Sequence, residues 1–374
     1  MAKLIGGLPN QVPTNGDLGT MAYQDYDVVA PQFLAGGRRN LIINGAMQVA
    51  QRGTSFTCTN ATVITLDRYT VYEGAGGATT YTVTQDSDAP AGFSNSLKIV
   101  NSTAVSLSSG QYGALRYAVE GYDNVSTAMG TSSAKEVTLS FWVKSSLTGT
   151  FGVTFRASGG SSANYVSSYT INSANTWEYK TVTYPATSLG TWNSTNGTGS
   201  DIIWSLGTGS SFSNTAGYWN TGSNKFALTG ETKINGTAGA TFQITGVQLE
   251  VGSIATPFEH RSYGEELALC QRYFQVYWSG ANVAFASGGG WSNGEAYAGV
   301  TFPVPMRTAP TFLSSGSCRF RSAGTSHTSA GMGAGDTTNY ASMFYTTAAG
   351  TVPSGNGGWF DGTAGSYGYW DAEL

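Results

Sequence analysis

The sequence predicts an all-β protein made of an antiparallel jelly-roll sandwich, a short α-helix and a smaller C-terminal β domain. Short runs of alternating apolar and polar residues recur between clusters of Gly, Ser and Asn, which is typical of strands joined by turns. The best-marked helix signals follow residue 260, after most of these runs. Beyond the helix the strand pattern continues with more glycine and more aromatic residues.

Residues 38–258 carry the pattern of the sandwich. Val137 and Phe141 share one face of the run EVTLSFWVK, and Trp142 lies on the other. Roughly nine runs of this kind, with polar turns between them, favour a jelly roll among antiparallel sandwiches. The stretch 211–240 is too long and too rich in Gly, Asn, Ser and Thr for a minimal hairpin, so it is either a mobile loop or a decorated insertion.

A strand, a turn and a helix are predicted within residues 242–274. The alternation breaks at Gly246 and resumes on the opposite parity, which indicates a strand with a β-bulge. Ser262 and Glu265 have the spacing of a capping box, which starts a helix. We therefore assign residues 259–275 as a connecting helix.

Residues 276–374 are predicted to form the second, smaller β domain. Glycine clusters at 288–290 and 355–358 mark its turns. Aromatic residues are more frequent in this part than the chain average of 13%. Some aromatic side chains are therefore expected to remain exposed after the core is filled.

Several stretches resemble bacteriophage tail fibre and tail spike proteins. The matching stretches are NLIINGAMQVAQRG (40–53), LDRYTV (66–71), LSFWVKSS (139–146), VQLEVGSIATPFEHRSYGEELALCQRYF (247–274), FPVPMRTAPT (302–311) and DAEL (371–374). In the resembling proteins, a carbohydrate-binding-module-like jelly roll passes into a distal tip. The resemblance implies a fibre or spike but identifies no host and no glycan.

The resemblance also implies a role for each part of the chain. Residues 1–37 would be the virion-attachment segment, docking on a tail adaptor or nozzle protein. By itself, their Gly/Pro-punctuated sequence indicates either a flexible tail or a segment ordered by a partner. Residues 38–258 would be the jelly roll, and 276–374 the receptor-binding tip. A homotrimer is implied, with the helices of residues 262–274 meeting near its axis.

Composition excludes several classes of partner. Only 11% of the residues are charged, the net charge is −4, and no Lys/Arg run occurs, so we expect no nucleic-acid binding. No stretch approaches 18 apolar residues, and the first residues lack an apolar signal segment. We therefore expect no membrane insertion, and a virion location reached by host lysis.

No catalytic or metal-binding set emerges from the residue types that usually form one. Cys58, Cys270 and Cys318 are widely spaced and are interpreted as buried or half-buried thiols, and His260 and His327 lack any metalloprotease context. No cofactor is therefore expected, and the chain is expected not to be an enzyme.

Paired carboxylates need separate treatment, because glycan-cleaving spikes use two acids across a cleft. The close acid pairs are Asp25 with Asp27, Asp86 with Asp88, and Glu265 with Glu266. All lie on predicted loops or on an exposed helix turn, where solvated side chains are expected. Asp86 and Asp88 supply too few oxygens to assign a calcium site, and that question stays open.

The positive indication is binding, because sugars stack on indole and phenol rings and present hydroxyls to short polar side chains. Two glycine-rich segments, 288–297 and 355–370, combine these residue types. The candidate ligand-binding residues are Trp291, Tyr297, Trp359, Phe360, Tyr367 and Trp370. The alternative for each is a place in the small β core, an alternative favoured for Tyr367 and Trp370 on the final strand.

The predicted function is therefore a phage tail fibre that adheres to a bacterial surface polysaccharide or outer-membrane receptor. Weak contacts would be added up over several copies. Three alternatives remain: a tail spike polysaccharide depolymerase, a free carbohydrate-binding module or lectin, and a head or baseplate decoration protein. Binding by the jelly roll itself, rather than by the tip, also remains open.

Overall fold

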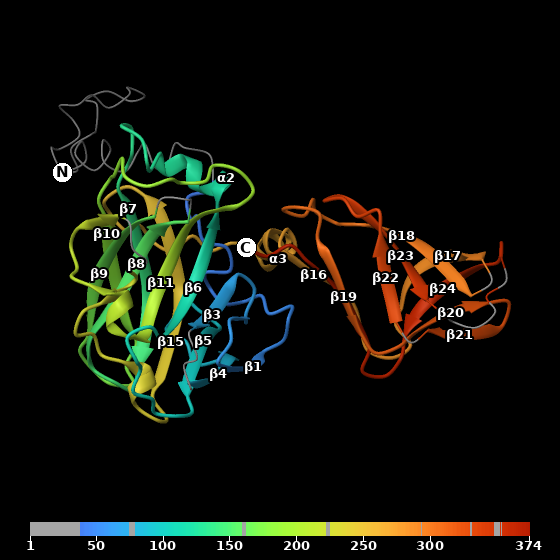
Figure 1. Cartoon of the computed structure of the whole chain (residues 1–374), viewed down its shortest axis with the longest axis horizontal. Coiled ribbons are helices and arrows are strands. Elements are labelled where there is room, and N and C mark those ends of the chain that lie inside the picture. The colour runs from blue at the N-terminus through green and yellow to red at the C-terminus, as the bar shows by residue number, and fades with distance from the viewer. Residues whose placement is uncertain are drawn as a thin grey trace, which may run out of the picture. The chain divides into compact units, whose positions relative to one another are not determined.

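The computed structural model describes residues 38–74, 79–158, 162–221, 225–292, 294–329, 331–347, 352 and 354–374. The proposed virion-attachment segment, residues 1–37, lies outside the described residues. By internal contacts the chain divides into residues 1–40 and 41–374. The second unit holds every helix and strand described below (Figure 1).

Two antiparallel sheets form the predicted jelly-roll sandwich (Figure 1). The six-stranded sheet has the order β1 (Ser55–Thr59), β4 (Thr80–Asp86), β5 (Ser96–Asn101), β15 (Thr241–Val251), β7 (Val137–Ser145), β10 (Glu178–Tyr184). The seven-stranded sheet has the order β13 (Trp219–Thr221), β9 (Ala163–Ile171), β8 (Gly149–Ala157), β11 (Thr198–Thr208), β6 (Tyr112–Glu120), β3 (Tyr69–Gly74), β2 (Val63–Ile64). A four-residue helix, α2 (Gly121–Asn124), follows β6.

The sandwich core lies between the inward faces of these two sheets. Val137 and Phe141 of β7 are fully buried, as their alternation predicted. Phe141 meets Trp204 of β11 edge to face, with 5.8 Å between ring centroids. Burial of such large side chains is the main stabilising contribution in a sandwich of this size.

The stretch 211–240 packs on the seven-stranded sheet rather than standing clear of it. Its short strands β12 (Ser213–Asn214) and β14 (Ala227–Leu228) pair in parallel. Phe226 is fully buried and clusters with Ala114 and Ile203 on that sheet. Of the two alternatives, a mobile loop or a decorated insertion, the described part of the stretch therefore fits the insertion.

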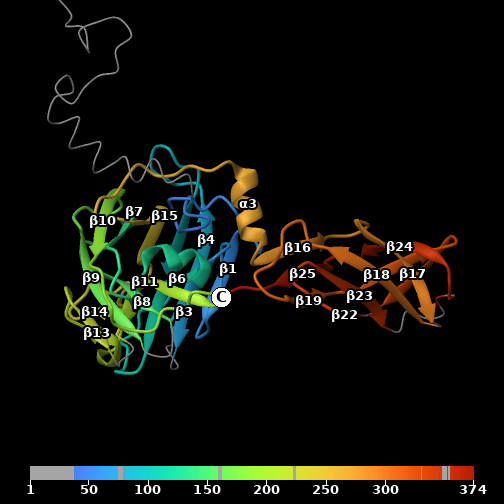
Figure 2. The same ribbon diagram turned by 90° about the horizontal axis from the view of Figure 1, so that it is seen from above.

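The predicted bulge and helix are both confirmed, although the helix is shorter than the assigned residues 259–275. The pairing of β15 with β7 shifts between Thr245 and Gln248, and Gly246 has φ 59°, which favours glycine. Helix α3 (Tyr263–Gln271) begins after Ser262, whose side chain and that of Glu265 form the reciprocal capping box. Figure 2 shows α3 between the sandwich strands and β16 (Phe274–Ser279). Among the described helices, none is long and apolar enough to cross a membrane.

The C-terminal β domain, called the tip below, consists of two further sheets. The three-stranded sheet has the order β16, β25 (Tyr367–Asp371), β19 (Thr311–Ser315). The seven-stranded tip sheet has the order β21 (Thr325–Ser329), β20 (Cys318–Ser322), β24 (Gly357–Gly362), β17 (Ala284–Ser292), β18 (Glu295–Thr301), β23 (Ala341–Thr347), β22 (Gly331–Gly335). Phe344, Phe360 and Trp370 belong to one buried cluster, so the inward faces of the two sheets share a core.

Candidate ligand-binding surface

The outward face of the seven-stranded tip sheet, called the outer tip face below, collects three of the six predicted binding residues. Successive side chains of a strand point to opposite faces. In β18, Ala296 and Ala298 are buried in the core, so Tyr297 points outward. In β24, Phe360 is buried, so Trp359 points outward.

Strand pairing aligns residues of five strands into one row across this face. Gly333 pairs with Tyr345, Tyr345 with Tyr297, Tyr297 with Gly289, and Gly289 with Gly357. The row therefore has two tyrosines beside two consecutive glycines. Tyr297 and Gly357 are two strands apart, which places their Cα atoms on the order of 10 Å from each other.

Aromatic rings gather at the tyrosine end of the row. Tyr297 and Tyr345 stack with 5.5 Å between ring centroids and 29° between ring planes. Trp291 stands 6.0 Å from Tyr297 in an edge-on contact and is 73% exposed. Trp291 lies at the register shift between Gly290 and Ser292 in the pairing of β17 with β18. The rings thus form a platform with open faces.

The glycines make the middle of the face flat and open. Among the described residues, a Cβ added at Gly357 or at Gly299 would meet no atom within 4 Å, and one at Gly289 would meet only Asn356 O at 3.6 Å. Glycine weakens a strand, and it commonly marks a place where a ligand or another backbone approaches closely. Nothing in the local packing requires glycine at these positions. Because these glycines carry no side chain, a ligand has room to contact the backbone of the sheet directly.

Trp359 and two arginines border the other end of the face. Trp359 is 49% exposed and pairs in register with Ser287 and with Arg321. Arg319 Nε donates to Asp361 Oδ1 at 2.7 Å, and Arg321 Nε donates to Asp361 Oδ2 at 2.5 Å. One carboxylate thus holds two guanidinium groups, of which Arg321 keeps 31% of its side chain exposed. This end offers an indole face beside hydrogen-bond donors.

No family model and no curated protein matches the chain. Among solved structures, it is similar to the enzymatically active domain of tailspike protein 4 from bacteriophage CBA120, with 14% identity, a TM-score of 0.29, and coverage of 57% of this chain and 21% of that chain.

Two further solved structures belong to bacterial proteins. A putative sugar-binding protein from Bacteroides thetaiotaomicron has 13% identity, a TM-score of 0.31, and coverage of 57% of this chain and 100% of that chain. The CBM22-1 and GH10 modules of Clostridium thermocellum xylanase 10B have 11% identity, a TM-score of 0.29, and coverage of 60% of this chain and 30% of that chain. TM-scores this low support no inference about what the chain binds.

Two predicted binding residues are corrected by the structure. Phe360 and Trp370 are fully buried in the tip core. Phe360 packs 5.1 Å from Phe344, and Trp370 packs 4.6 Å from Phe312, measured between ring centroids. Phe360 and Trp370 each occupy an inward position of their strand, so neither presents its ring to a ligand.

Tyr367 lies on a different surface from the other exposed aromatic residues. It belongs to β25 of the three-stranded sheet, is 41% exposed, and stacks on Tyr369 with 5.6 Å between centroids and 16° between ring planes. It lines a cavity near the sandwich, which is treated separately below. The six predicted residues therefore divide among the outer tip face, the tip core and this cavity.

Sequence reasoning missed two members of the outer tip face. Tyr345 lies outside the two glycine-rich segments 288–297 and 355–370, and Arg321 is not an aromatic residue, so the pattern of glycine-flanked aromatic residues includes neither. Both occupy outward positions of alternating strands, as the burial of Phe344 and Phe320 shows. Alternation in ASMFYTT and CRFRS would have identified the outward positions, but strand pairing is needed to place them beside Tyr297 and Trp359.

The acid pairs considered for catalysis or calcium have structural partners. Asp86 pairs with Lys98 at 2.9 Å, and Asp88 pairs with Lys144 and accepts a hydrogen bond from Trp177 Nε1 at 3.1 Å. The Lys144 ammonium lowers the pKa of Asp88, so this carboxyl is ionised at neutral pH. Asp25 and Asp27 lie outside the described residues.

The cysteines are buried thiols, as predicted. Burial raises the pKa of Cys58 and of Cys318 to about 12, and raises that of Cys270 as well. A thiol with so high a pKa forms almost no thiolate at neutral pH and is unreactive. Over the described ranges, no group of three or more His, Cys, Asp or Glu side chains is arranged to hold a metal ion.

Proposed function

We propose that this chain is a phage tail fibre that adheres to a bacterial surface glycan through the outer tip face. The observation that carries the proposal is the arrangement of this face: exposed Trp291 and the Tyr297–Tyr345 stack at one end, Trp359 at the other, and open glycines between them. The virion role itself rests on the sequence resemblance.

The arrangement suits a sugar chain for a physical reason. The C–H faces of sugar rings pack on indole and phenol rings, while their hydroxyls need hydrogen-bond partners at the edges. Trp291 and Trp359 offer the ring faces, and Arg321 and Glu295 offer polar groups beside them. The flat glycine surface lets a chain of sugars lie across the strands between the two aromatic ends.

Adhesion by such a face requires several copies. An open, flat surface buries little of each ligand, so a single site binds weakly, and linked copies raise the total affinity. We propose a homotrimer held to the tail by residues 1–37 and released by host lysis. Helix α3 (Tyr263–Gln271) spans fewer than two heptads, so contacts between β domains must contribute to trimerisation.

We propose adhesion without cleavage. Asp361 is the carboxylate beside Trp359, and both its oxygens are engaged by arginines. A carboxylate whose two oxygens both accept hydrogen bonds from guanidinium groups has little freedom to exchange a proton with a substrate, so it is a poor general acid or base. A polysaccharide depolymerase would instead release reducing ends from host capsule, and the loss of that release on one acid-to-amide change would overturn this part of the proposal.

The test measures binding of the fluorescently labelled full chain to a panel of bacterial cells and to surface polysaccharide purified from the strains that bind. We expect Trp291→Ala and Trp359→Ala each to weaken binding at least 10-fold, because each removes a stacking face. Tyr340→Ala is the matched control, since Tyr340 is a 63% exposed aromatic residue of the tip outside the row of paired residues. Unchanged binding in both Trp variants would refute recognition by this face.

A separate experiment tests the virion role. Deleting residues 1–37 from the phage gene is expected to yield particles without fibres, because the attachment segment is missing. Normal particles that still carry the chain would favour a head or baseplate decoration docked through another segment. Normal particles in which the chain has no place would favour a free carbohydrate-binding module or lectin.

A further inference from the structure

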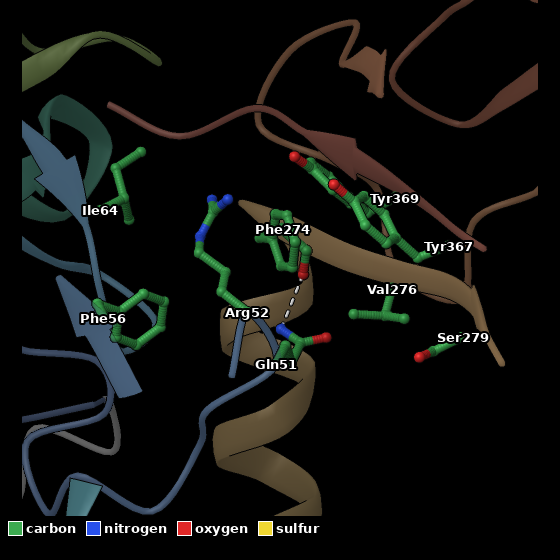
Figure 3. Close-up of a pocket in the computed structure, with 9 residues that line it drawn as sticks. All are labelled: Gln51, Arg52, Phe56, Ile64, Phe274, Val276, Ser279, Tyr367 and Tyr369. Carbon is green, nitrogen blue, oxygen red and sulfur yellow. Dashed lines mark hydrogen bonds between the residues drawn. The ribbon is translucent and has the colours of Figure 1, made fainter. Parts of the chain in front are cut away.

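A cavity of about 430 Å³ lies beside the three-stranded tip sheet, on the side of the sandwich. Figure 3 shows its lining side chains, which come from two parts of the chain far apart in sequence. The lining residues are Gln51, Arg52, Phe56, Ile64, Phe274, Val276, Ser279, Tyr367 and Tyr369. Its volume falls within the range of small-molecule binding sites, and it does not overlap the outer tip face.

Two tyrosines supply the flat wall of this cavity. Tyr367 and Tyr369 are alternate residues of β25 and therefore share the outward face of the three-stranded sheet. Tyr369 packs against Phe274 at 4.9 Å between centroids, which fixes the inner ring of the pair. Tyr367 stacks on Tyr369 with one face and remains 41% exposed. One phenol face is thus open to a ligand.

The polar groups around the tyrosines are suited to hydroxyl partners. Gln51 Nε2 donates to Asp67 Oδ1 at 2.6 Å and to Phe274 O at 2.8 Å, the second bond being drawn in Figure 3. These bonds fix the amide, whose Oε1 accepts no hydrogen bond from a described residue. Ser279 is exposed at the Tyr367 end of the cavity and pairs with it in register. An oriented acceptor therefore lines the same cavity as the phenol face, and an exposed hydroxyl lies at its Tyr367 end.

Charge compensation in the cavity favours a neutral ligand. Arg52 is the cation in the lining, and it pairs with Asp371 at 2.9 Å and with Glu373 at 3.3 Å. Its guanidinium also lies 3.6 Å above the centre of the Phe274 ring. A bound anion would have to compete with the two carboxylates already in place. A bound cation would meet the guanidinium.

We propose that this cavity binds one ring of a neutral pyranose sugar, stacked on Tyr367 with its hydroxyls toward Gln51 and Ser279. The site is independent of the outer tip face and gives the chain a second glycan contact of different geometry. Because its lining combines Phe56 and Ile64 of the sandwich with strands of the tip, a bound sugar touches both parts of the chain.

The experiment is saturation-transfer difference NMR on the full chain with the methyl glycosides of D-glucose, D-galactose, D-mannose and N-acetyl-D-glucosamine. We expect transfer to the ring protons of at least one of them. Tyr367→Ala removes the stacking face, and Val276→Trp fills the cavity from β16, so each should reduce the transfer that arises in the cavity at least fivefold. Near-ultraviolet circular dichroism confirms that each variant keeps its packing.

Two further variants separate this site from the outer tip face. The double variant Trp291→Ala with Trp359→Ala removes the aromatic ends of the outer tip face, so the transfer that remains in it reports the cavity. Added to the double variant, Tyr367→Ala should reduce this remaining transfer at least fivefold, whereas Tyr340→Ala should leave it unchanged. Absence of transfer to all four glycosides would overturn the proposal. So would transfer in the double variant that is not reduced when Tyr367→Ala or Val276→Trp is added to it and the chain remains folded. Transfer that disappears in the double variant Trp291→Ala with Trp359→Ala would assign the sugar to the outer tip face. It would also show that the cavity binds none of these glycosides.

Discussion

Arg52 and Asp371 form an ion pair of 2.9 Å although 319 positions separate them in the sequence. Arg52 belongs to the segment before β1 in the sandwich, whereas Asp371 ends the last strand of the tip. Glu373 extends the contact, since it pairs with Arg52 and also with Arg68, whose side chain is 1% exposed. The last residues of the chain thus bind the tip to the sandwich.

Removing the charge of Glu373 should destabilise this junction. Glu373→Gln keeps the side-chain size but leaves the buried Arg68 without its carboxylate, and breaking a buried pair costs about 3 kcal/mol. We expect a loss of that size in the free energy of unfolding, measured by urea denaturation. Lys98→Met is the control, because the partly exposed pair Lys98–Asp86 should contribute under about 1 kcal/mol. A smaller loss for Glu373→Gln than for Lys98→Met would contradict this account of the junction.

Two glycines of the tip should respond in opposite ways to the same substitution. Gly357 faces open space, so Gly357→Val should leave the melting temperature nearly unchanged while its side chain blocks the flat surface and weakens cell binding about 10-fold. At Gly288, an added Cβ would lie 2.1 Å from Tyr297 O, so Gly288→Val should destabilise by several kcal/mol. Thermal melting and cell binding, measured on both variants, check these outcomes. Full binding by a folded Gly357→Val variant would exclude a ligand on this surface.

Local features of the fold could be predicted because their cause is local. The bulge at Gly246 appears in the sequence as a change of parity, and the capping box needs only Ser262 and Glu265. The site was harder to predict, because Trp359 and Phe360 are neighbours in one glycine-flanked stretch, and only pairing with distant strands decides which ring faces the core. Tyr345 joins Tyr297 through such pairing alone.

The capping box offers a direct test of the start of α3. Ser262→Ala removes the side-chain acceptor for Glu265 N, a bond of 3.3 Å, and leaves a helix donor unpaired. We expect a loss of about 1 kcal/mol in the free energy of unfolding. Ser253→Ala is the matched control, since Ser253 is exposed and lies before the helix. Equal stability of the two variants would mean that the cap contributes nothing.

Burial of Glu231 predicts a pH dependence of stability with a definite sign. Burial raises its pKa from 4.5 to about 7, although Ser205 Oγ donates to one oxygen and Leu228 N to the other at 3.2 Å. Between these two pKa values the folded chain keeps the proton and the unfolded chain loses it. The contribution of this proton to the free energy of unfolding is therefore fully present below pH 4.5 and falls as the pH rises to about 7. Above that pH it no longer changes.

The matched substitution Glu231→Gln isolates this contribution, because an amide keeps the shape of the protonated carboxyl and does not titrate. Burial also raises the pKa of Glu73 to about 7, so the wild type alone would report both groups. We expect the stability difference between wild type and Glu231→Gln to shift by about 2.5 kcal/mol between pH 5 and pH 8, with the Gln variant gaining at pH 8. Urea denaturation at the two pH values measures it. A difference that stays constant with pH would show that Glu231 is ionised in the folded chain at both, and that its hydrogen bonds from Ser205 and Leu228 outweigh the effect of burial.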